Sequence, residues 1–125
     1  MTLTDALFWV FLANAIALVL HEMDAVHWQE WEMFGLPGHE PGFLSLHIPL
    51  LAMMLLGLVG VADGIWWGLA IGLAVGLCGL FAFGIHTYQL RRGMPVFNTS
   101  PSRLILRATL LLSIPQVVLS LIGLV

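Results

Sequence analysis

The chain has 125 residues, of which 60 % are hydrophobic and 9 % are charged, and its formal net charge is −3. Soluble globular domains are about 45–50 % apolar and about 25 % charged, so this composition excludes a soluble domain and indicates an integral membrane protein. Four basic residues supply all of the positive charge, which is too little for a nucleic-acid-binding surface.

Four apolar segments account for nearly the whole chain. We place them at residues 3–34, 41–60, 65–90 and 101–124, joined by short loops. About 20 apolar residues cross a bilayer, so each segment is long enough for one span. The sequence therefore predicts an all-α, single-domain protein over residues 1–125: an integral membrane up-down four-helix bundle. At the start of the last span, Ser100 is the expected N-cap and Pro101 the expected first helical residue.

The positive charges are confined to one region of the chain. All four flank the connection between the third and fourth spans: Arg91, Arg92, Arg103 and Arg107. Cytoplasmic loops of membrane proteins are enriched in Lys and Arg. This distribution predicts that the third connection is cytoplasmic, that both termini lie outside, and that the protein resides in the cytoplasmic membrane.

The third span carries a glycine at every fourth position: Gly64, Gly68, Gly72 and Gly76. Small residues at this spacing form a stripe that lets another helix approach closely. The stripe is explained either by packing inside the same bundle or by a seam to a second copy or a partner membrane protein.

Histidines occur at similar depths in three of the spans. At about 1.5 Å per residue from the outer surface, His21 lies roughly 25 Å in, His47 roughly 20 Å and His86 roughly 30 Å. Ionisable groups inside a span are costly and are functional candidates. We therefore expect these three imidazoles to share a site; separate structural hydrogen bonds are the alternative.

The first span adds further candidate ligands close to His21. His21, Asp24 and His27 are three residues apart on one side of a helix, a spacing that resembles metal sites in helical bundles. Imidazole and carboxylate ligands suit transition metals, with zinc and iron as the first candidates. The predicted metal ligands are His21, Asp24, His27, His47 and His86.

The glutamates of the first span have two interpretations. Glu22, Glu30 and Glu32 either pair with the arginines at the same membrane face or take part in the site. On a continuous helix Glu30 points nearly opposite His21, and its candidate catalytic role is that of a general base. His39, in the loop that follows, is expected to be a solvated residue.

The segment from His21 to Gly38 resembles the signature of an uncharacterised family of small four-span bacterial membrane proteins. The signature has the form HxxDxxxWxEWxxFxxPG, and its matching positions are His21, Asp24, Trp28, Glu30, Trp31, Phe34, Pro37 and Gly38. The resemblance implies a bacterial membrane location and no established activity. A more distant likeness connects residues 27–30 to proposed metal-binding membrane proteins named for an HxxEE motif, with Trp31 in place of the second Glu.

Two functions fit these patterns. The first is a metal-dependent enzyme with its site near the cytoplasmic interface, acting on a lipid-like substrate by hydrolysis with zinc or oxidation with a redox metal. The second is a non-enzymatic membrane subunit, in which histidines such as His21 and His86 hold a haem or pigment and the glycine stripe faces a partner. The shared site predicts that His86→Ala and His47→Ala each lower metal content and thermal stability together.

Overall fold

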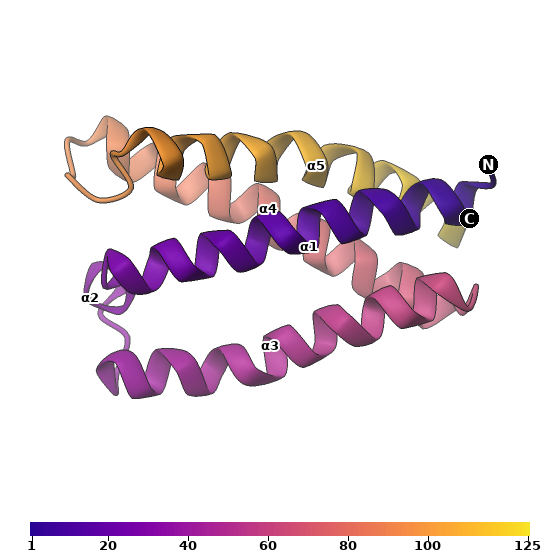
Figure 1. The fold of residues 1–125 in the computed structure, drawn as a ribbon, viewed down its shortest axis with the longest axis horizontal. Coiled ribbons are helices and arrows are strands. Elements are labelled where there is room, and N and C mark those ends of the chain that lie inside the picture. Colours follow the sequence, from indigo (N-terminus) through magenta and orange to yellow (C-terminus); the bar gives the residue numbers. More distant parts are fainter.

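The computed structural model describes residues 1–125 as an all-helical protein (Figure 1). Its elements are α1 (Leu3–His27), α2 (Glu30–Phe34), α3 (His39–Ala62), α4 (Trp66–Arg91) and α5 (Ser100–Leu124). The four long helices α1, α3, α4 and α5 are each of a length and hydropathy that would carry them across a bilayer. The predicted membrane bundle of four long helices with short connections is therefore confirmed.

The first helix is shorter than predicted. Instead of continuing to residue 34, α1 ends at His27, and Gln29 adopts a left-handed conformation (φ 53°) before α2 begins at Glu30. The prediction of an unbroken helix is wrong. No Gly or Pro marks the break in the sequence; instead, tertiary packing favours the break, which buries Trp31 against Phe43 with their ring centroids 5.7 Å apart.

The start of α5 also differs by one residue from the prediction. Its N-cap is Thr99, whose hydroxyl accepts a hydrogen bond from the backbone N–H of Ser102 at 3.2 Å. Ser100 is therefore the first helical residue and Pro101 the second. Pro tolerates this position because the N–H groups of the first turn have no partner within the helix.

Helix α1 lies between two other long helices that do not touch each other. It packs against α5 on one side and against α3 on the other. Helix α4 lies behind and contacts both α3 and α5 (Figure 1). The two chain termini lie together at one end of the bundle, while α2 and the connection from α4 to α5 lie at the other end. This topology brings the last turns of α1 and α4 next to α2.

Glycines of α4 permit close packing within the chain. Gly68 faces Gly60 of α3 so closely that a Cβ on Gly68 would overlap backbone atoms. Gly72 and Gly76 pack against side chains of α1 and α5, and of the predicted stripe only Gly64 has open space around it. The structure therefore favours packing inside the bundle over contact with a second copy or a partner protein, because other helices of the same chain already cover most of the glycine stripe.

A hydrogen-bonded polar cluster joins three helices in the middle of the bundle. The Asn14 amide donates to Ser113 Oγ at 3.1 Å and to Gln116 Oε1 at 2.8 Å. The Gln116 amide in turn donates to the carbonyl of Gly72 at 2.7 Å. All of these side chains are fully buried, so α1, α4 and α5 are held together by polar bonds for which water does not compete.

Candidate metal centre

Two imidazoles and one carboxylate converge at the end of the bundle that carries α2. They belong to His21 of α1, Glu30 of α2 and His86 of α4, and each offers a ligand atom within 4.8 Å of the other two. His86 Nε2 lies 3.3 Å from Glu30 Oε1. The rings of His21 and His86 meet edge to face, with centroids 4.8 Å apart. Only 2 % of His21, 1 % of His86 and 12 % of the Glu30 side chain is exposed, so the cluster is largely shielded from solvent.

The break between α1 and α2 is what places Glu30 in this cluster. On an unbroken helix Glu30 would point away from His21, as the sequence predicted. The left-handed Gln29 redirects the chain, and Glu30 faces His86 instead. The left-handed conformation costs a residue with a Cβ roughly 1–2 kcal/mol, so surrounding contacts must stabilise this turn.

One of those contacts ties the end of α1 to the start of α5. Trp28 Nε1 donates a hydrogen bond to Ser102 Oγ at 3.3 Å. The Ser102 hydroxyl lies 2.7 Å from Thr99 Oγ1, so the hydroxyl that caps α5 belongs to the same network. The N-terminus of α5 thus supports the turn that carries Glu30.

Aromatic side chains form the walls of the cluster. Phe97, in the loop before α5, is fully buried, and its ring centroid lies 4.1 Å from that of His86 and 5.5 Å from that of His21. Phe34 of α2 lies 6.1 Å from His86. Apolar walls lower the local dielectric constant and strengthen electrostatic contacts inside. Phe97 is not among the residues predicted from the sequence, where its only signal is a large apolar residue directly before Asn98, Thr99 and Ser100.

Three buried polar atoms near the cluster have no hydrogen-bond partner: His21 Nδ1, His86 Nδ1 and Asp24 Oδ2. Buried polar groups in proteins are paired in the great majority of cases, so unpaired ones call for an explanation. Imidazole lone pairs beside a carboxylate have the chemistry of a cation site. Asp24 lies one turn after His21 and is not among the converging residues, which gives it at most a supporting position.

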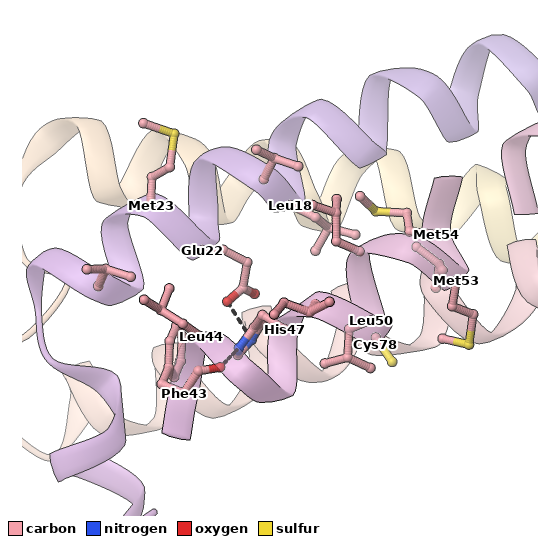
Figure 2. A pocket seen from close by; sticks show the side chains of 15 residues that line it. Leu18, Glu22, Met23, Phe43, Leu44, His47, Leu50, Met53, Met54 and Cys78 are labelled. Atoms are coloured by element: carbon pink, nitrogen blue, oxygen red, sulfur yellow. Dashed lines mark hydrogen bonds and ion pairs between the residues drawn. The ribbon is translucent and has the colours of Figure 1, made fainter. Parts of the chain in front are cut away.

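His47 lies outside this cluster. Its Nδ1 donates to the carbonyl of Phe43 at 2.7 Å, and its Nε2 lies 2.8 Å from Glu22 Oε2 (Figure 2). The Glu22–His47 pair bridges α1 and α3 inside a cavity of about 430 Å³. The structure therefore brings together two of the three histidines that were expected to share a site, because matched depth does not reveal which way α3 turns its side chains.

The remaining candidates lie at the surface. His27 is exposed at the end of α1, with its ring against that of Trp28. His39 is exposed as expected and pairs with Glu32 at 2.9 Å. Of the two interpretations left open for the glutamates, pairing with the arginines does not occur. Each glutamate faces a histidine instead: Glu22–His47, Glu30–His86 and Glu32–His39.

Comparison with known proteins gives a family and no activity. No match was found among curated proteins or among solved structures. A model described as a family of unknown function, DUF6713, matches residues 7–123, a range that includes His21, Glu30 and His86. The expectation of an uncharacterised family is thereby confirmed. With nearly its whole length matched, the chain belongs to the family of unknown function DUF6713.

Proposed function

We propose that this membrane protein binds one transition metal ion through His21, Glu30 and His86. The observation that supports the proposal is the convergence of two buried imidazoles and one carboxylate, contributed by three helices, within 4.8 Å. An ion bonded at about 2.1 Å bridges atoms up to about 4.2 Å apart, so a small inward shift of the side chains would complete the set. A cation would also neutralise the carboxylate of Glu30 in a nearly closed environment.

Zinc and iron are the first candidates for this ion. Two histidines and one carboxylate are found at catalytic zinc sites and at non-haem iron sites, and both kinds keep coordination positions open for water or substrate. In this proposal Glu30 is a ligand and not the general base that the sequence suggested. The function favoured is a metal-dependent enzyme on a lipid-like substrate, by hydrolysis with zinc or oxidation with iron. The nearby arginine-rich connection favours a site at the cytoplasmic interface, with both termini outside.

A haem held between His21 and His86 is the weaker alternative. Axial imidazoles bind the iron from opposite faces of the macrocycle, each at about 2 Å from its ligating nitrogen. Their ring centroids must then lie farther apart than the 4.8 Å that separates those of His21 and His86. A non-enzymatic subunit that holds a metal ion for stability would bind the same ion without turnover.

Metal analysis of two matched variants tests the proposal. Protein extracted in mild detergent without chelators is loaded with Zn²⁺ or Fe²⁺, desalted and measured by elemental mass spectrometry. Loss of a residue that only supports a ligand already weakens metal binding by about 10–100-fold, so Glu30→Gln should cost at least that much. Glu22→Gln is the control, because Glu22 also faces a histidine but lies outside the converging set.

The expected result is bound metal in the wild type and in Glu22→Gln, with loss in Glu30→Gln. Equal metal content in Glu30→Gln and the wild type would overturn the assignment of Glu30. Equal losses in the two variants would place the site elsewhere, and an absence of bound transition metal in the wild type would overturn the function itself.

A further inference from the structure

The cavity between α1 and α3 is lined by residues that differ from those of the metal cluster. Thirteen of its fifteen lining residues are hydrophobic, and the two exceptions are Glu22 and His47 (Figure 2). Helix α4 contributes Val75 and Cys78 to the lining. Its volume of about 430 Å³ falls within the range of roughly 300–1,000 Å³ that is typical of small-molecule sites.

The cavity is elongated along α3. Its lining extends from Phe43 to Met54, which is about 16 Å at roughly 1.5 Å per residue. Glu22 and His47 meet nearer the Phe43 end, and Met53 and Met54 lie at the other end (Figure 2). Methionine side chains adapt their shape to what they contact. A cavity with one polar point and a long apolar extension fits a molecule with a head and a chain.

The Glu22–His47 contact leaves one buried acceptor without a hydrogen-bond partner. The Nδ1–H of His47 donates to the carbonyl of Phe43, and its Nε2 lies 2.8 Å from Glu22 Oε2. That oxygen is nevertheless buried without a hydrogen-bond partner, so a donor on a bound molecule would satisfy it. A hydroxyl group can donate to this oxygen. An ionised carboxylate head has no donor and would be buried beside it at a high cost.

We propose that this cavity binds a single-chain lipid with an uncharged hydroxyl head, of the monoacylglycerol type. Its hydroxyl groups hydrogen-bond to the Glu22–His47 pair, and its acyl chain lies along α3 towards Met53 and Met54. Since α1 and α3 are both candidate membrane spans, the cavity draws its occupant from the bilayer and not from water. This inference does not depend on the metal site, because none of the three proposed ligands lines the cavity.

Photochemical labelling tests the proposal on the full chain. The protein is placed in phosphatidylcholine nanodiscs with a monoacylglycerol that carries a diazirine near the end of its chain. After irradiation, the adduct is quantified by intact mass and located by peptide sequencing. Labels are expected on the Met53 end of the cavity. An unlabelled monoacylglycerol should compete at least about tenfold better than the fatty acid of the same chain, because the latter is ionic.

Two tryptophan variants on α3 provide a matched comparison. Leu51 lines the cavity and Leu55, one turn later, does not, although both are about half exposed. Leu51→Trp should fill the cavity and reduce labelling at least about tenfold, whereas Leu55→Trp should leave it unchanged. Glu22→Gln should remove the preference for the neutral lipid, because the carboxylate that disfavours a fatty-acid head is then replaced by a neutral amide.

Labels spread over the outer faces of α4 and α5 in the wild type would overturn the site, whatever the behaviour of the variants. Equal labelling of Leu51→Trp and Leu55→Trp would also overturn it. A wild-type preference for the fatty acid would overturn the assignment of an uncharged head.

Discussion

The protein contains two glutamate–histidine pairs inside its bundle, and they differ in almost everything except composition. Glu30–His86 is nearly closed to solvent, includes a second imidazole from His21, and depends on a break in the chain. In Glu22–His47 the side chains are 37 % and 24 % exposed; this pair joins two regular helices and opens into an apolar cavity. The same residue types therefore form the metal-ligand set that we propose in one place and the proposed head-group contact in the other.

The difference lies in what surrounds each pair. The Nδ1 of His47 is satisfied by the carbonyl of Phe43, and its Nε2 faces Glu22 alone. His86 has a second nitrogen without a partner and an aromatic ring of Phe97 against it. A satisfied imidazole is a structural or ligand-recognising group, whereas an unsatisfied buried one, beside another, is suited to coordination.

The largest effect is expected from His86→Ala. This change leaves Glu30 nearly buried without its partner, and breaking a buried pair in this way costs about 3–5 kcal/mol. We expect a large loss of stability together with loss of bound metal, measured by detergent-based unfolding and elemental analysis. His47→Ala is the control: His47 lies outside the converging set, so the metal should remain. Similar losses in both variants would remove the distinction between the two pairs.

The next largest effect is expected from Gly68→Ala. A Cβ there would overlap the backbone of Gly60, and overpacking of this kind costs about 1–3 kcal/mol. Because the contact fixes α3, the displacement should disturb the α1–α3 cavity and reduce lipid labelling. The metal cluster uses α1, α2 and α4 and should keep its ion. Gly84→Ala, with no atom within 4 Å of the new Cβ, should change neither property. Loss of metal with unchanged labelling in Gly68→Ala would contradict this separation.

A smaller effect is expected at the break before α2. Gln29→Val forces a β-branched residue into the left-handed conformation, at a cost of about 1–3 kcal/mol that favours extending α1 and turning Glu30 away. Metal affinity, measured by competition with a chelator, should fall by about tenfold for each 1.4 kcal/mol. Gln29→Gly allows the same conformation freely and should bind metal at least as well as the wild type. Equal affinities in the two variants would show that the break does not position Glu30.

The smallest effect is expected from Trp28→Phe. It removes the hydrogen bond to Ser102 while keeping an aromatic ring, which should cost about 0.5–1.5 kcal/mol and a modest part of the metal affinity. Trp66→Phe, at an exposed position on α4, is the control and should be neutral. Calorimetric metal titration of both variants distinguishes the two results, and equal affinities would mean that the contact with α5 does not support the cluster.

The sequence by itself determined the number of long helices and the depth of the candidate site. A bilayer requires about 20 apolar residues per span, so hydropathy alone identifies four long helices. A constant rise per residue also places His21 and His86 at matched depth, and the two rings do meet.

Only the tertiary structure decided which residues accompany His21 and His86 in the cluster. Glu30 joins the cluster because the chain turns at Gln29, where no Gly or Pro signals a break and the burial of Trp31 outweighs the strain. His47 pairs with Glu22 because the rotation of α3 about its own axis is set by packing against α1 and α4, and a nearly uniform apolar helix carries little periodicity from which that rotation can be read.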